Sequence, residues 1–414
     1  MKKECRLQRK QKNWGWSYKL KQNAKFLNMR HLLEKYEKKL VESGLVEKDE
    51  PILGGLDAEL SWNRDDPLCT ELEKVFDGLN INSLLYAKPS EPYLSIFKYL
   101  AEREPDAILP NDSETRTFLH DLPVISHFDT DKIIEKLKSR KSVIIPGEAI
   151  ITWGMVSPEQ AFIFYSSVCF AGFVKFFTDY LYDKKEGKVT AEQQQVFDMA
   201  KRHLDNLPDE MPSLMKGPFK SVDEVYDAIF ETGRKVVEYR LVDSFFGNIS
   251  YLYDNVLYIS QTTSSLDELE GCIDPCPLDG SNCSSITASS EYIAHKDMVE
   301  RTGKRGVLHG HPKFSVIMSL YCDKKKDCEF NKVCYKKCPE TRLIDGNIPI
   351  VPGEPGAGTY GLCHTVPSAL EKYPGVIVYG HGVFTVVEND FNSAFGTLMD
   401  IEKQCRDEYF RLLS

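Results

Sequence analysis

Three stretches of the chain carry apolar residues at helical spacing and predict three helices. The first is expected over about 29–44, ends at Ser43-Gly44, and has one apolar stripe: Leu32, Leu33, Tyr36 and Leu40. The second begins at Ser157-Pro158, where serine can cap a helix and proline can occupy its first position. It is apolar nearly all round, so we expect it in the core or at a subunit contact. The third opens with a capping box, Ser221-Val222-Asp223-Glu224.

Between these helices, β-branched runs predict strands and polar runs predict connections. Residues 142–145 and 150–153 are expected to pair as strands, and 105–123 to form a loop. From 183 to 218 the chain turns polar and contains three prolines, so we place a domain boundary there. The predicted organisation is a basic arm over 1–25, a first domain over 26–205, a linker over 206–218 and a second domain over 219–414.

The second domain repeats the pattern of the first. Residues 146–152 (PGEAIIT) align with 379–385 (YGHGVFT) at an offset of 233 residues. Further upstream the offset is 223 for residues 84–89 and 196 for residues 40–46. An offset that grows along the chain predicts a duplicated fold with insertions in the second copy. Three histidines of the second copy, discussed below, are replaced in the first by Tyr86, Lys88 and Glu148.

Composition and charge narrow the class of protein. The 414 residues allow two or three domains with sizeable cores, and the net charge of -10 argues against a nucleic-acid partner. The first forty residues carry thirteen Lys/Arg against three Glu, which predicts a solvated, poorly ordered leader, with an anion-binding or regulatory role as the alternative.

Location follows from the apolar stretches and the cysteines. The most hydrophobic stretch, 161–182, is interrupted by polar residues, so we expect a buried helix and no membrane contact. No apolar region follows the basic start, and twelve cysteines without an export signal indicate a reducing compartment. We expect a cytoplasmic protein.

The clearest candidate chemistry lies in His309-Gly310-His311 and Gly380-His381-Gly382. Two histidines separated by one residue share a face of an extended strand, and the third lies in a glycine-flanked turn between β-branched runs. A lone core histidine is usually satisfied by a backbone carbonyl. Three converging imidazoles, in contrast, can hold one divalent metal and leave a coordination position open. The pattern therefore predicts a catalytic metal site.

Five motifs, in order and spacing, resemble the class II aldolase/adducin family over residues 219–414: 247–250 (GNIS), 257–262 (LYISQT), 289–291 (SSE), 309–311 (HGH) and 381–382 (HG). The resemblance implies a three-layer α/β/α sandwich around a central β-sheet, which the repeat would duplicate in one chain. It also implies chemistry on an enediolate held by Zn2+ or another divalent metal. Relatives include sugar-phosphate aldolases, epimerases, a dehydratase and the non-catalytic adducins.

The resemblance also implies residue roles. His309, His311 and His381 would be the metal ligands, and Glu291 the catalytic acid/base, although Glu291 could equally favour a helix start through the dipole. Five residues would contact substrate or its phosphate: Gly247, Asn248, Thr262, Ser289 and Ser290. They could also be only turn residues and a helix cap. Thr263 departs from the pattern, because these enzymes commonly have glycine there and a Cβ obstructs close approach to a phosphate.

An insertion over 322–338 displaces the region where family aldolases place a tyrosine at the site of a neighbouring subunit. It carries a C-x5-C-x5-C-x3-C run: Cys322, Cys328, Cys334 and Cys338. Four thiolates could enclose a second, structural Zn2+ or an iron-sulfur cluster. Isolated thiols in a charged loop are the alternative.

Together these patterns predict a metal-dependent lyase acting on a small hydroxy-carbonyl compound such as a sugar phosphate. An epimerase or dehydratase of the same family is the alternative within enzymes, and an adducin-like interaction protein the alternative outside them. Because family members form four-fold rings, a tandem chain is expected to form a homodimer or a higher assembly.

Overall fold

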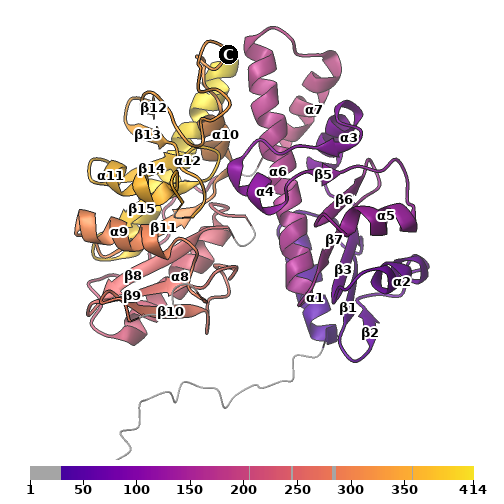
Figure 1. Ribbon diagram of the computed structural model, residues 1–414, viewed down its shortest axis with the longest axis horizontal. Coiled ribbons are helices and arrows are strands. Elements are labelled where there is room, and N and C mark those ends of the chain that lie inside the picture. The colour runs from indigo at the N-terminus through magenta and orange to yellow at the C-terminus, as the bar shows by residue number, and fades with distance from the viewer. Residues whose placement is uncertain (1–28, 205, 244–245, 282–285, 357) are drawn as a thin grey trace, which may run out of the picture.

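The computed structural model describes residues 29–414 except 205, 244–245, 282–285 and 357. The basic arm expected over 1–25 lies outside the described residues. Two halves, each built around a β-sheet, lie side by side, the N-terminal half in indigo to magenta and the C-terminal half in orange to yellow (Figure 1).

The N-terminal half has a five-stranded sheet in the order β2-β1-β3-β7-β6 and a separate pair, β4-β5. Its elements are α1 (Met29–Glu42), β1 (Ile52–Leu56), β2 (Leu60–Trp62), α2 (Cys69–Gly78), β3 (Ser83–Ala87), α3 (Tyr93–Arg103), β4 (Ala107–Ile108), α4 (Ser113–Phe118), β5 (Leu122–Pro123), α5 (Thr130–Leu137), β6 (Ser142–Ile145), β7 (Ala149–Gly154), α6 (Pro158–Lys185) and α7 (Ala191–Arg202).

The C-terminal half has an eight-stranded sheet in the order β10-β9-β8-β11-β15-β14-β13-β12. Its elements are α8 (Val222–Glu238), β8 (Asn248–Tyr253), β9 (Val256–Ser260), β10 (Ile273–Pro277), α9 (Tyr292–Thr302), β11 (Gly306–Gly310), α10 (Lys313–Leu320), β12 (Arg342–Ile344), β13 (Ile348–Val351), a 3-10 turn (Leu362–His364), α11 (Val366–Leu370), β14 (Gly375–Val378), β15 (Val383–Val387) and α12 (Phe391–Leu413).

Helices cover both faces of each sheet, so the expected mixed α/β fold is confirmed. On the outer faces, α2 and α5 bury one apolar core against the N-terminal sheet, and α9 and α11 bury another against the C-terminal sheet. The inner faces share a single large core, built by α1, α3 and α6 from one half and by α8, α10 and α12 from the other. The two halves therefore pack as one body along their inner helices (Figure 1).

The long helix α6 lies at the centre of this shared core. It starts where its sequence predicts, with Ser157 at the N-cap position and Pro158 in the first turn, but the Ser157 side chain makes no capping hydrogen bond. The helix is long and apolar enough to cross a bilayer, but the whole of its most hydrophobic window is buried inside the protein. The buried cation Lys175 is paired with Glu104 at 2.8 Å and with Asp179 at 3.2 Å. Apolar residues occur all round α6 because it contacts both halves.

Two predicted connections contain regular structure. The expected loop 105–123 holds β4, α4 and β5, and α4 is capped by Asp112, whose side chain accepts from the backbone N–H of Thr115. The polar stretch 183–218 contains α7, on which Phe197 stacks against Tyr180 of α6 with ring centroids 3.8 Å apart. Its last part, 206–218, has no helix or strand.

The strands of the two sheets correspond in order and in register. The order β2-β1-β3-β7-β6 matches β9-β8-β11-β15-β14 within the larger sheet. Ile52 pairs with Tyr86 as Asn248 pairs with His309, at the offsets of 196 and 223 residues found in the sequence. The pairings of β6 with β7 and of β14 with β15 are related in the same way by 233 residues. The register differs by one residue only at the β1–β2 hairpin, where the connection is one residue longer.

Candidate metal centre

Three histidines converge in the C-terminal half, beside the contact with the N-terminal half. His309 lies on β11, and His381 lies in the turn between β14 and β15, as predicted. His311 was expected on the same strand but lies just beyond its end, before α10. All three are at most 2 % exposed, and one ring nitrogen from each lies within 4.8 Å of the others.

The ring nitrogens have distinct partners. Nδ1 of His309 is 2.9 Å from the carbonyl oxygen of Val383, which requires the proton on Nδ1 and leaves Nε2 as a lone-pair donor. That Nε2 lies 2.9 Å from Nε2 of His311. Two imidazole nitrogens that face each other at this distance suit either one shared proton or a cation between them. The donor set therefore fits a divalent metal bound by nitrogen.

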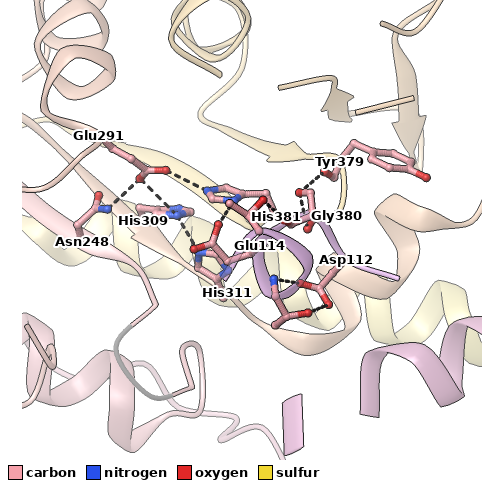
Figure 2. A network of polar contacts seen from close by, with 12 residues as sticks. Asp112, Glu114, Asn248, Glu291, His309, His311, Tyr379, Gly380 and His381 are labelled. Carbon is pink, nitrogen blue, oxygen red and sulfur yellow. Dashed lines mark hydrogen bonds and ion pairs between the residues drawn. The ribbon is translucent and has the colours of Figure 1, made fainter. Parts of the chain in front are cut away.

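Glu291 closes the site on the side of α9. Its Oε1 is 3.0 Å from Nε2 of His381, its Oε2 is 3.6 Å from Nε2 of His309, and Asn248 donates to Oε2 at 2.8 Å (Figure 2). Glu291 occupies the N-cap position of α9, as expected, but its side chain makes no capping hydrogen bond. Its carboxylate instead faces the histidines, at the place a fourth ligand or a proton carrier would occupy.

Burial and charge set the protonation of these groups. Burial lowers the pKa of His309 to about 4 and that of His311 well below its usual value, so both are neutral near pH 7, as metal ligands must be. Burial alone would also lower the pKa of His381, but the carboxylates of Glu114 and Glu291 raise it to about 10. For Glu291, burial is opposed by His309, His381 and the Asn248 amide, and its pKa falls well below the ordinary range. Without metal, His381 is thus an imidazolium between two carboxylates.

Glu114 was not expected at the site. It lies on α4 of the N-terminal half, and its Oε2 is 3.0 Å from Nδ1 of His381 (Figure 2). The oxygen lies off the line of the ring N–H, so the contact is an ion pair and not a well-aligned hydrogen bond. Nothing in the local sequence around Glu114 distinguishes it from other acidic residues. Only the packing of the two halves brings it to His381.

The five residues matched to substrate or phosphate contacts have different surroundings. Asn248 is buried and bonded to Glu291, and buried Ser289 accepts from the backbone N–H of Glu291 at 3.2 Å. Gly247 has φ +89, and a Cβ there would lie 2.5 Å from the carbonyl oxygen of His309. Thr262 and Ser290 are exposed on adjacent segments. The neighbouring Thr263 has φ +61, a conformation that favours the glycine expected there.

The four cysteines of the insertion surround one hollow. Cys322, Cys328, Cys334 and Cys338 line a cavity of about 370 Å³, together with four basic residues, Lys324, Lys325, Lys337 and Arg342. Among the residues that the structure describes, the three histidines are the one group whose ligand atoms all lie within 4.8 Å of one another. The sulfurs therefore share a cavity without the close convergence that a single ion requires.

Comparison with known proteins gives one family. Residues 227–409 match the model of the Class II Aldolase and Adducin N-terminal domain. A search of curated proteins finds no match.

Solved structures with similar chain traces cover about half of this chain. An L-fuculose-1-phosphate aldolase from Thermus thermophilus has 20 % identity and TM-score 0.37, and covers 45 % of this chain and 93 % of its own. A sugar-phosphate aldolase from Thermotoga maritima has 20 % identity and TM-score 0.32, with coverages of 46 % and 96 %. The match of residues 227–409 to the family model supports a place for the C-terminal half in the class II aldolase and adducin family.

Proposed function

We propose that the chain is a divalent-metal-dependent lyase of the class II aldolase type, which makes or breaks a C–C bond beside the carbonyl of a small hydroxy-carbonyl compound. The observation that carries this proposal is the group of three buried imidazoles with a buried carboxylate facing them. The match of residues 227–409 to the aldolase and adducin family supports the same reaction class.

Each residue has a role that its surroundings support. His309, His311 and His381 hold Zn2+ or another divalent ion, which when bound polarises the substrate carbonyl. Glu291 moves the proton that aldol cleavage requires, because its carboxylate faces Nε2 of two ligands, His309 at 3.6 Å and His381 at 3.0 Å. Asn248 holds one oxygen of Glu291, so the other is oriented towards the site.

An epimerase or a dehydratase would use the same residues. We propose a sugar phosphate as the class of substrate. Thr262 and Ser290 are the matched residues whose exposed side chains are available to an anionic group. An adducin-like interaction protein is the alternative outside enzymes. The buried carboxylate beside three buried histidines favours the enzyme, since a docking surface would not require these groups.

We also propose that the chain is a tandem duplication whose N-terminal copy has lost the metal. The shared strand order and register support this origin. At the positions equivalent to His309 and His381, the hydroxyl of Tyr86 donates to Glu148 at 2.9 Å. Lys88, equivalent to His311, is exposed. A hydrogen-bonded Tyr–Glu pair thus takes the place of two ligands.

The assembly and the location follow as proposals. A tandem chain can form a ring-like assembly as a homodimer, and light scattering that finds only a folded monomer contradicts this. Ten cysteines lie in the described part of the chain, and all ten are free thiols, which suits the reducing cytoplasm.

The cysteine insertion is proposed to hold a second, structural metal. The cavity is lined by four thiols, four basic residues and three acidic residues, Asp327, Glu329 and Glu340. The separation of the thiols favours an iron-sulfur cluster over a single Zn2+, because a cluster holds its thiolates further apart. Iron, sulfide and zinc analysis of protein purified without oxygen tests this. A protein with no metal beyond the histidine site contradicts it.

The main experiment measures metal and turnover together. The purified chain should hold one divalent ion, and replacing His309, His311 and His381 with alanine should remove it. A protein without that ion, or a triple variant that keeps it, contradicts the proposal. Dihydroxyacetone phosphate with a panel of aldehydes then tests aldol chemistry, and ribulose phosphates test epimerisation.

A further inference from the structure

The N-terminal half contacts the candidate metal centre through the start of α4. The backbone N–H of Ser113 donates to the carbonyl oxygen of Gly380 at 2.7 Å, and its hydroxyl donates to the same oxygen at 2.8 Å. Gly380 has φ +60 and immediately precedes His381. The turn that carries the third histidine is therefore held from the other half of the chain.

The next residue of α4 contacts the imidazole itself. Oε2 of Glu114 and Nδ1 of His381 are both buried and lie 3.0 Å apart, and neither atom has another hydrogen-bond partner among the described residues. Each atom is therefore satisfied only through the other. Leaving either one alone in a buried site would be costly.

We propose that Glu114 is a positioning residue of the metal centre, supplied by the N-terminal half. A carboxylate beside Nδ1 keeps the proton on that nitrogen, fixes the ring orientation and leaves Nε2 of His381 as the ligand atom. The inference rests on the proposed metal binding by the three histidines.

Comparison of the histidines shows why an outside carboxylate is required. His309 has its Nδ1 proton fixed by the carbonyl of Val383 within its own half. No described residue of the C-terminal half forms a hydrogen bond with Nδ1 of His381. Its contact is with Glu114 of the N-terminal half. The N-terminal half, which lacks the three histidines, thus completes a ligand of the site in the other half.

Charge gives Glu114 a second effect. Three neutral imidazoles and one carboxylate leave a bound divalent ion with net positive charge. The carboxylate of Glu114, whose Oε2 is buried against a ligand, adds compensating negative charge close to the ion. Replacement by glutamine keeps an acceptor oxygen and removes the charge, whereas alanine removes both. Affinity should therefore fall from parent to Glu114→Gln to Glu114→Ala.

The test uses the full chain, stripped with a chelator and titrated with Zn2+ against a chromophoric competitor. Glu114→Ala should weaken Zn2+ binding about 10- to 100-fold, the range for lost partners of ligating histidines. Loading with Co2+ at saturation adds a spectroscopic readout, because altered orientation of His381 should change the visible absorption of the bound ion. Glu114→Gln should lie between parent and Glu114→Ala in affinity.

Two controls isolate the carboxylate. Ser113→Ala removes the hydroxyl contact to Gly380 but keeps Glu114, and Glu192→Gln removes a surface carboxylate paired with Arg103 at 3.0 Å. Glu192→Gln should bind Zn2+ within about twofold of the parent. Ser113→Ala, which keeps the backbone contact to Gly380, should lose less affinity than Glu114→Ala. Thermal unfolding of the metal-free forms shows whether each variant folds. If Glu114→Ala does not fold, Glu114→Gln takes its place in the comparison with the parent.

The outcomes separate this inference from the proposed function. A parent that binds metal beside a Glu114→Ala variant of equal affinity and spectrum overturns the inference alone. Equal losses in Ser113→Ala and Glu114→Ala also overturn it, because the grip of α4 would then explain the effect. A parent that binds no metal at the histidines overturns both.

Discussion

Replacing Gly382 with alanine tests how tightly the metal centre is packed. A methyl group at this position would lie 2.5 Å from the carbonyl oxygen of Gly310, 2.9 Å from Cε1 of His309 and 3.1 Å from Cδ2 of His311. At contacts under 3.0 Å, the methyl group or the neighbouring atoms must move. The backbone at Gly310 is held by its pairing with Val383, so the strain falls on the strands or on the two rings.

The expected magnitude follows from this geometry. Overpacking a close-packed site typically costs about 1–3 kcal/mol. We expect the free energy of unfolding of the stripped protein to fall by that amount. If the two histidine rings move to relieve the strain, the metal-bound state is destabilised too. Each 1.4 kcal/mol of that destabilisation lowers metal affinity about tenfold.

Chemical denaturation and Zn2+ competition measure the two effects. Gly358→Ala is the matched control, because a methyl group there has no neighbour within 4 Å and should change stability by less than about 0.5 kcal/mol. If Gly382→Ala equals the parent in both stability and affinity, the packing derived for the site is wrong.

Three further predictions address stability and metal binding. Burial raises the pKa of Glu402 from an ordinary 4.5 to about 7, so the folded state is destabilised when Glu402 ionises. As the pH falls from 7 to 4.5, protonation of Glu402 should raise the free energy of unfolding by roughly 3 kcal/mol. Chemical denaturation should show this pH dependence in the parent and not in Glu402→Gln. Tyr409→Phe removes the hydroxyl that donates to the carbonyl of Phe177 at 2.9 Å across the two halves, and should cost about 1 kcal/mol in the same assay. Zn2+ at 100 times its Kd should stabilise the parent by about 2.7 kcal/mol, and an equal gain in His311→Ala would contradict the ligand assignment.

Local signals in the sequence were sufficient for the elements that frame the fold. The stripe from Leu32 to Leu40 predicts a helix over 29–44, and α1 spans Met29–Glu42. The predicted strands 142–145 and 150–153 appear as β6 and β7, and α6 starts at Pro158. In each case neighbouring residues carry the pattern, so no distant contact is needed to recognise it.

Signals that depend on packing were missed. The helix α4 is one turn and a half long, and its cap at Asp112 was hidden in a polar loop with no apolar stripe. The position of Glu114 beside His381 follows from how two halves pack, which no spacing along the chain records. The contact between the amide of Asn248 and Glu291 was also not indicated by the sequence, and the substrate contact that the resemblance implies for Asn248 stays a prediction.

Because the two halves share one core within one chain, the site responds differently to dilution of the protein than a site between separate subunits does. In a ring of separate subunits, a residue donated by a neighbour leaves the site whenever the ring dissociates. Here the peptide chain joins donor and acceptor, so the effective concentration of α4 at His381 is fixed and independent of protein concentration. The joined halves can also differ at equivalent positions, so one can keep Tyr86 where the other keeps His309.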